Sequence, residues 1–354
     1  MDDTSISLLA KRVKENFRGS IRPVKIWIDG QTYSVKKCDG SKFSKKENIS
    51  NISKLNEDKL FCTKFGLPSL YYYKLNKYRT SDVDVVKYRT NTSITYPKHG
   101  TEGILEILGI SDESVQEAKA QIVSIIADIR EQLSPLQFVS IPLYSSEIKH
   151  NFEEFKKNIL AENHGGVEES IFVSSLKLHL TILVFTLLNE QEIQEALNTL
   201  RECKNLFLRN VDQRKNPIKM KVQGLNCMNS NLSKVNVLYA EPYLTDDSEC
   251  EKDLQEIANA ISNLFYEKGF AKENRENVKL HMTLMNTKYR KPKKKDNPSR
   301  RWIKRETFDA TQIMEKYKDF YFGEAMFNNI HLSLMSCEGE DGYYTSLGSV
   351  KMFE

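Results

Sequence analysis

One short pattern occurs twice in this chain, and it restricts the fold more than any other feature. Lys177–Thr181 reads KLHLT and Lys279–Thr283 reads KLHMT, so two of the six histidines lie in matching contexts. Alternate side chains of a β-strand share a face. We therefore expect the lysine, histidine and threonine of each copy to lie on one face of a strand, with buried aliphatic side chains on the other face.

The repeated histidines and threonines form a candidate catalytic set. Cleavage of a phosphodiester in line needs one group that takes a proton from the attacking oxygen and another that gives a proton to the leaving oxygen. Histidine can do either, because its unperturbed pKa is about 6.5. Threonine hydroxyls can donate hydrogen bonds to the non-bridging phosphate oxygens. The predicted catalytic residues are His179, Thr181, His281 and Thr283, and this chemistry requires no metal and no cofactor.

Two lysines accompany the motif, and one further histidine is similar to it. Lys177 and Lys279 can add positive potential beside a phosphate, or can be strand-end residues that reach solvent. His331 lies in an H-x-S on a predicted strand without a partner copy, so we interpret it as structural or as a secondary wall of the site. The remaining histidines are expected at the surface, since they lie in turn-like contexts: His99, His150 and His164.

The length of 354 residues allows about two domains, each with a core of its own. The hydrophobic content of 40% and charged content of 28% are typical of globular proteins. The six cysteines are scattered without a C-x-x-C pair, which favours a reducing intracellular compartment over a disulfide framework or a zinc site. No apolar run approaches the roughly 20 residues of a membrane span, so no membrane association is expected.

The first part of the chain divides into three predicted regions. Residues 1–36 hold an amphipathic helix over 5–17 and a strand hairpin with an Asp29-Gly30 turn signal, and we interpret them as a partner-binding segment. The polar residues 37–64 are a predicted flexible linker. Residues 65–134 are expected to form two helices, two strands and a long helix capped by Ser111.

Residues 135–354 mix strands and helices in an order that nearly repeats, with one copy of the motif in each half. Such mixing favours an α+β fold. We expect two lobes, each with an antiparallel sheet, around a cleft that brings the two histidines and the two threonines together.

The two H-x-T strands resemble the two-histidine (2H) phosphoesterase superfamily. The stretches "SIFVSSLKLHLTI", "VNVLYAE", "NVKLHMTLMNTKYRK", "FDATQI" and "FYFGEAMFNNIHLS" are similar, more closely, to the family of the KH-containing subunit of the activating signal cointegrator complex, as is "RPVKIWIDGQTY". This resemblance implies a bilobal 2H domain that acts on RNA with 2′,3′-cyclic phosphates or 2′-5′ linkages.

The resemblance also implies a KH-like domain over residues 65–134. A KH domain places G-x-x-G between its first two helices so that the backbone can approach nucleic-acid phosphates. Here the equivalent positions read Lys77, Tyr78, Arg79 and Thr80, without a glycine. Positive charge and a ring for stacking are retained, and the predicted nucleic-acid contacts are Lys74, Lys77, Tyr78 and Arg79, with Lys177 and Lys279 beside the catalytic set. A KH-like domain kept for protein contacts or packing is the alternative.

The segment Lys288–Arg305 places ten lysines and arginines in eighteen residues. Such a run is a solvated loop, an RNA-phosphate clamp or a nuclear localisation signal. By resemblance, the chain is a nuclear subunit that works in transcription coactivation and alkylation-damage repair beside a helicase subunit and a ubiquitin-binding subunit.

Three functions remain open from the residues. The first is an RNA-directed phosphodiesterase that uses His179 and His281 as its acid-base pair, with a bell-shaped pH profile. The second is an RNA-reading scaffold whose site binds a phosphate without turnover. The third is a 2′-5′ ligase, which would run the same site in reverse.

Overall fold

The computed structural model describes residues 24–28, 31–35, 60–98, 101–210, 218–244, 250–271, 277–291 and 306–352. The predicted helix over residues 5–17 and most of the predicted linker lie outside these ranges. In the described part, no helix has the length and apolar character that crossing a membrane requires.

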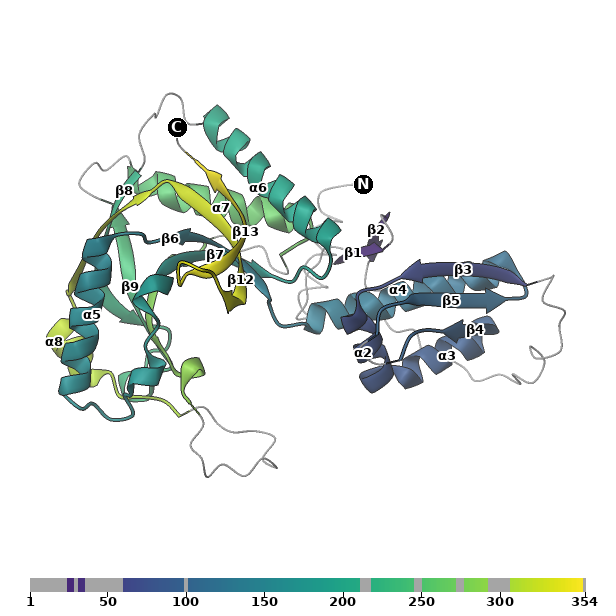
Figure 1. The fold of residues 1–354 in the computed structure, drawn as a ribbon, viewed down its shortest axis with the longest axis horizontal. Helices are drawn as coiled ribbons and strands as arrows, with labels where there is room; N and C mark the ends of the chain where they lie inside the picture. Colours follow the sequence, from purple (N-terminus) through teal and green to yellow (C-terminus); the bar gives the residue numbers. More distant parts are fainter. Residues whose placement is uncertain are drawn as a thin grey trace, which may run out of the picture. The chain divides into compact units, whose positions relative to one another are not determined.

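The chain divides into two compact units. Unit 1 comprises residues 1–134 together with 186–195 and 266–273, and unit 2 comprises residues 135–185, 196–265 and 274–354. Each unit has its own sheet and its own helices (Figure 1).

Unit 1 contains a three-stranded antiparallel sheet in the order β3-β5-β4. Its elements follow the chain as β3 (Phe61–Gly66), α2 (Ser69–Tyr78), α3 (Thr80–Thr90), β4 (Thr92–Thr95), β5 (Ile104–Gly109) and α4 (Asp112–Gln132). The predicted order of two helices, two strands and one long helix is thus observed. Strand β3 was not predicted, and residues 61–64, which we assigned to the linker, belong to it.

Helix α4 covers this sheet because apolar side chains recur along one of its faces. Ser111 caps the helix as expected, since its hydroxyl accepts a hydrogen bond from the Ser114 N–H at 3.2 Å. Ala118, Ile122 and Ile126 are fully buried. They pack with Tyr71, Tyr72, Leu75, Leu105 and Ile107 in one hydrophobic cluster. This cluster gives unit 1 a core of its own.

The predicted N-terminal hairpin is present as β1 (Val24–Ile28) and β2 (Gln31–Val35), which pair antiparallel. The Trp27 ring stacks on the Phe270 ring at 5.1 Å, and the Arg130 guanidinium lies 5.3 Å from the Trp27 ring. Arg130 also donates two hydrogen bonds of 2.9 Å to the buried carboxylate of Glu192. Unit 1 therefore contains a buried ion pair that joins the end of α4 to residues 186–195.

Unit 2 contains an eight-stranded sheet in the order β11-β8-β9-β10-β7-β6-β12-β13, and every pair is antiparallel. The strands are β6 (Gln137–Pro142), β7 (His179–Phe185), β8 (Ile218–Cys227), β9 (Val237–Leu244), β10 (Met282–Asn286), β11 (Tyr321–Phe327), β12 (Asn329–Glu338) and β13 (Tyr344–Lys351). The helices are α5 (Ser146–Ala161), α6 (Glu190–Asn210), which begins in unit 1, α7 (Cys250–Glu267) and α8 (Thr311–Tyr317).

The sheet topology corrects one expectation about the fold. We expected two separate sheets on either side of a cleft, but β7 and β10 are neighbours in one curled sheet (Figure 1). Each motif copy leads into the inner strand of one half of the sheet. The mixed α+β class is confirmed, while the two lobes are halves of one sheet rather than two sheets.

Two further differences from the sequence prediction concern unit 2. Strand β11 was not predicted; it pairs with β8 and packs on α5, with Phe155 of α5 and Phe322 of β11 5.5 Å apart between ring centroids. His164 is 8% exposed and pairs with Glu162 at 3.0 Å, so the prediction of a surface position was wrong. His150 is exposed as expected, and His99 lies outside the described residues.

Candidate active site

The two motif copies meet at the centre of the eight-stranded sheet. Leu180 of β7 and Met282 of β10 are directly opposite each other. Continuing this antiparallel register places His179 opposite Thr283 and Thr181 opposite His281. Directly opposite residues share a face, with Cβ atoms about 5 Å apart. All four predicted catalytic side chains therefore lie together on one face of the sheet.

The opposite face of these strands explains why the arrangement is stable. Leu180, Ile182, Met282 and Leu284 are at most 1% exposed. The aliphatic positions of each copy thus anchor the strand in the core, and the alternation of a strand forces the polar positions to the other face.

Each histidine is fixed by the backbone two residues before it. His179 Nδ1 lies 2.7 Å from the Lys177 carbonyl oxygen, and His281 Nδ1 lies 2.7 Å from the Lys279 carbonyl oxygen. A carbonyl only accepts, so in both rings Nδ1 carries the proton and donates it. Nε2 of each neutral imidazole is then a lone-pair nitrogen that can take a proton.

The threonine beside His179 contacts the free nitrogen of that ring. Thr181 Oγ1 lies 3.0 Å from His179 Nε2, and the hydroxyl is the donor because Nδ1 already holds the ring proton. A phosphate oxygen near the same position would compete for this hydroxyl. The contact thus joins the proton-accepting nitrogen of His179 to the hydroxyl that is predicted to donate a hydrogen bond to the phosphate.

Burial weakens the affinity of both imidazoles for a second proton. Burial lowers the pKa of His179 to about 4; the hydrogen bond to the Lys177 carbonyl opposes this shift, and the nearby His281 adds to it. The pKa of His281 is lowered as well, first by burial and then by Lys279, while the Lys279 carbonyl opposes the shift. The larger shift at His179 makes the two copies electrostatically different, although their sequences match.

Aromatic rings enclose both histidines, and we did not predict them from the sequence. Ring centroids of Phe138 and Tyr344 lie 5.1 and 5.4 Å from that of His179. The Tyr239 ring lies 5.2 Å from the His281 ring. These rings displace water from the imidazoles, which accounts for the lowered pKa values. The available sequence signals were the alternation along β9 and the two adjacent tyrosines at the start of β13.

The two lysines lie outside the strands to which the sequence assigned them. Lys177 ends a short 3₁₀ helix (Ser175–Lys177), and Lys279 precedes β10. Lys177 Nζ lies 2.6 Å from a Glu338 carboxylate oxygen. Lys279 Nζ lies 4.8 Å from the Tyr239 ring centroid. Lys177 Nζ also lies 5.5 Å from the Tyr344 ring centroid, so each ammonium group lies beside a ring that contacts one of the histidines.

The other predicted nucleic-acid contacts lie in unit 1, around the end of α2. A single residue, Arg79, separates α2 from α3, and it pairs with Asp82 at 2.9 Å. Lys77 Nζ contacts the Tyr73 hydroxyl at 2.8 Å. Tyr78 is 58% exposed, and the Lys74 ammonium lies 5.2 Å from its ring. Only Arg79 lies in the turn, while Lys74, Lys77 and Tyr78 belong to α2, so the prediction of a loop for these three residues was wrong. Whether they bind nucleic acid stays a prediction.

A single curled antiparallel sheet that carries two H-x-T strands side by side is a two-histidine (2H) phosphoesterase-like fold. The model of the AKAP7 2′5′ RNA ligase-like domain matches residues 135–352. Activating signal cointegrator 1 complex subunit 1 of Mus musculus is 32% identical over 293 residues, which are 80% of this chain and 81% of that protein. The chain belongs to the family of activating signal cointegrator 1 complex subunit 1, with an AKAP7 2′5′ RNA ligase-like domain.

More distant relatives match a smaller share of the chain. A-kinase anchor protein 7 isoform gamma of Homo sapiens is 26% identical over 228 residues, which are 64% of this chain and 59% of that protein. Among solved structures, E. coli LigT with 3′-AMP is 14% identical, covers 62% of this chain and 98% of its own, and has a TM-score of 0.35. TT0787 of Thermus thermophilus is 15% identical, covers 62% and 99%, and has a TM-score of 0.39.

Proposed function

We propose that unit 2 is an RNA-directed phosphodiesterase that hydrolyses 2′,3′-cyclic phosphate or 2′-5′ linkages without a metal. One observation carries this proposal. Both histidines present Nε2 on the same face, and both are held in the same tautomer by a backbone carbonyl at 2.7 Å. Two fixed imidazoles on opposite sides of one phosphate can divide proton removal and proton donation between them.

The unequal pKa values assign the two roles. With one proton shared between the imidazoles, His281 holds it, because the pKa of His179 is lowered further. His179 Nε2 takes a proton from the attacking water as its oxygen bonds to phosphorus. His281 Nε2–H gives its proton to the ribose oxygen as the bond between that oxygen and phosphorus breaks. The product from a cyclic phosphate is a nucleotide monoester.

The threonines act on the charge of the phosphate. Thr181 and Thr283 donate hydrogen bonds to the non-bridging oxygens, on which negative charge is concentrated in the transition state. Thr181 leaves His179 Nε2 when it does so, which frees that nitrogen to accept the proton from water. Lys177 and Lys279 raise the potential at the edge of the site and attract the RNA backbone.

Unit 1 supplies a second RNA contact in this proposal. The order of helices and strands matches what a KH-like domain requires. The exposed ring of Tyr78 stacks on a base, while Lys74, Lys77 and Arg79 contact phosphates. This surface takes the place of the backbone contact that a G-x-x-G would make.

The family relationship supports a role within a complex. We assign the chain as a nuclear subunit of the activating signal cointegrator complex, which works in transcription coactivation and alkylation-damage repair beside helicase and ubiquitin-binding subunits. The name of the mouse relative, a complex subunit, supports the role within a complex. Residues 1–36 are the proposed partner-binding segment.

A non-catalytic RNA-reading subunit is the second candidate, and one observation favours it. Because both pKa values are lowered, the free site has little protonated imidazole at neutral pH, and a phosphate would then bind without an acid to complete the reaction. A 2′-5′ ligase would use the same residues in reverse.

Turnover distinguishes these functions. The purified chain is incubated in EDTA with a short RNA bearing a 2′,3′-cyclic phosphate and with a 2′-5′-linked dinucleotide. We expect hydrolysis of at least one substrate and a loss of at least roughly hundredfold in His179→Ala and in His281→Ala. Binding without turnover would support the RNA-reading subunit, and joining of RNA ends would support the ligase. His150→Ala, an exposed histidine of α5, is the matched control.

A further inference from the structure

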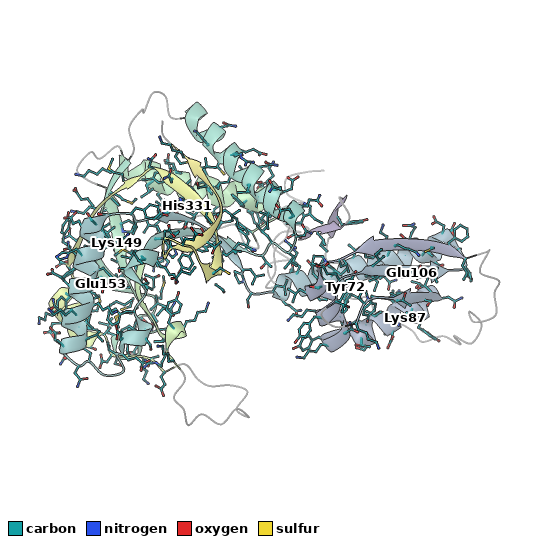
Figure 2. The ribbon with its side chains drawn as sticks, in the orientation of Figure 1. Tyr72, Lys87, Glu106, Lys149, Glu153 and His331 are labelled. Atoms are coloured by element: carbon teal, nitrogen blue, oxygen red, sulfur yellow. The ribbon has the colours of Figure 1, made fainter. Side chains whose placement is uncertain are left out.

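A third histidine lies in line with the catalytic set. His331 of β12 is opposite Ser140 of β6, and Ser140 is opposite Thr181 of β7. Directly opposite residues share a face, so His331 lies on the same face as Thr181. The two residues are two strands apart, which is about 10 Å at the usual strand spacing. Figure 2 shows His331 among the strands of unit 2.

One tyrosine lies between His331 and the active site. The Tyr343 ring is 6.0 Å from the His331 ring and 6.4 Å from the His179 ring, nearly perpendicular to both. Tyr343 is 2% exposed, and its hydroxyl hydrogen-bonds with the Ser140 hydroxyl at 3.2 Å. The His331 region is therefore continuous with the His179 region through a fixed side chain.

The ring of His331 has one nitrogen with an unmet hydrogen-bond capacity. Nδ1 is buried and has no hydrogen-bond partner within the described residues. Burial lowers the pKa of His331, so the ring is neutral near pH 7. A buried N–H without an acceptor is rarer than a buried acceptor without a donor, which places the ring proton on Nε2. His331 then offers one N–H donor to a ligand.

A solvent-exposed aromatic ring lies beside His331. Tyr144 is 52% exposed, and its ring centroid lies 6.0 Å from that of His331 and 5.6 Å from that of Tyr343. None of these three side chains is charged near pH 7, and the Asp341 carboxylate lies close enough to oppose the lowering of the His331 pKa. An exposed aromatic side chain next to a neutral N–H donor suits a planar ligand ring that carries hydrogen-bond acceptors on its edge, such as a nucleobase. Two strands from Thr181, His331 is too far away to transfer a proton at the reacting phosphate.

We propose that Tyr144, His331 and Tyr343 form a nucleobase subsite, which holds the base of the nucleotide whose phosphate lies between His179 and His281. The subsite rests on the proposed function of unit 2 and names the part of the substrate that this half of the sheet recognises. Tyr144 stacks on the base, and His331 donates a hydrogen bond to its edge. Tyr343 separates the base from the reacting phosphate.

The test compares ligands with and without a base. Binding of adenosine 3′-monophosphate and of inorganic phosphate to the full chain is measured by calorimetry, which needs no turnover. Hydrolysis is measured on RNA ending in a 2′,3′-cyclic phosphate, with and without the terminal base. The variants are His331→Ala, Tyr144→Ala and His331→Gln, which keeps an N–H donor, with His150→Ala as the control.

The expected result is selective. Tyr144→Ala and His331→Ala weaken binding of the nucleotide and raise its KM by roughly five- to hundredfold, leave phosphate binding unchanged, and leave hydrolysis of the abasic RNA unchanged. His331→Gln restores part of the nucleotide affinity. Tyr144 is half-exposed, so its removal tests the subsite even where a change at His331 disturbs folding.

Three results would overturn the subsite. They are equal binding of the nucleotide and of inorganic phosphate by the wild type, equal weakening of both ligands by the variants, and unchanged nucleotide binding in Tyr144→Ala and His331→Ala. Absence of hydrolysis by the wild type would instead contradict the proposed phosphodiesterase. In that case, the calorimetric comparison still decides whether a base is recognised.

Discussion

Leu180 and Met282 pair across β7 and β10, and both side chains are fully buried. This one pair sets the register that brings His179, Thr181, His281 and Thr283 onto a common face. A shift of one residue in either strand would turn its histidine into the core and its aliphatic residues outward, at a large cost in buried apolar area. The core therefore holds the four candidate catalytic residues in place.

The lowered imidazole pKa values predict an acidic pH optimum. The active form has one neutral and one protonated imidazole, so kcat/KM rises as His179 loses its proton near pH 4 and falls as His281 loses its own. Because the pKa of His281 is below 6.5, the falling limb also lies below 6.5 in the free protein. We expect a bell with its maximum between about pH 4 and pH 6.5, measured on a 2′,3′-cyclic phosphate. A rate that rises steadily from pH 5 to 9 would contradict the assignment.

Replacing Thr181 or Thr283 by valine tests whether its hydroxyl donates a hydrogen bond to the phosphate. Thr181→Val and Thr283→Val keep the shape of the side chain but remove the hydroxyl, so the apolar packing is preserved. We expect kcat to fall by about a hundredfold in each, with a smaller change in KM, since the donated hydrogen bond strengthens in the transition state. Thr95→Val, at an exposed position of β4, is the control. A change confined to KM would show that the hydroxyls only bind the ground state.

Local patterns in the sequence predicted much of the site. Alternation within KLHLT and KLHMT was enough to place each histidine beside its threonine, because the period of a strand is a local property. The same alternation misplaced Lys177 and Lys279, since nothing local shows that the chain turns before His179 and His281. Which strands are neighbours in the sheet could not be predicted from the sequence, for a different reason. Whether β7 and β10 share one sheet depends on long-range register, and so does the position of Tyr343 beside His179.

The surface at the end of α2 predicts two separable effects on RNA binding. Lys77→Ala removes a phosphate contact, so affinity falls for all sequences and the slope of log affinity against log salt decreases by about one unit. Tyr78→Ala removes a stacking surface worth about 1–3 kcal/mol, with the salt slope unchanged. The measurement is fluorescence anisotropy of a labelled single-stranded RNA between low and moderate salt.

Lys87→Ala provides the matched control for this surface. Lys87 lies on α3 of the same unit and pairs with Asp84 at 3.2 Å, away from the α2–α3 turn (Figure 2). We expect little change in RNA affinity from this variant. Equal effects of Lys77→Ala and Lys87→Ala would indicate general electrostatic attraction, and would leave the domain with protein contacts or packing as its role.

The buried pair of Arg130 and Glu192 predicts a large asymmetry between single and double variants. Glu192 is fully buried, and it also accepts a hydrogen bond from the Leu188 N–H at 2.9 Å. Arg130→Met leaves this carboxylate without its cation, which should reduce the free energy of unfolding by about 3–5 kcal/mol. Arg130→Met combined with Glu192→Leu removes both charges, and we expect it to recover most of that loss, because two buried apolar side chains need no partner.

Urea unfolding measures this effect in unit 1. The chain has two tryptophans, so Trp302→Phe makes the fluorescence report on Trp27, whose ring lies 5.3 Å from the Arg130 guanidinium. Lys64→Met is the control, because Lys64 and Glu106 form an exposed ion pair and should contribute little to stability. A double variant as unstable as Arg130→Met would show that the loss comes from packing against Trp27 and not from an unpaired charge. Recovery in the double variant would identify the unpaired carboxylate as the main cause, because the Tyr71 hydroxyl and the Thr186 carbonyl lose their contact with Arg130 in both variants.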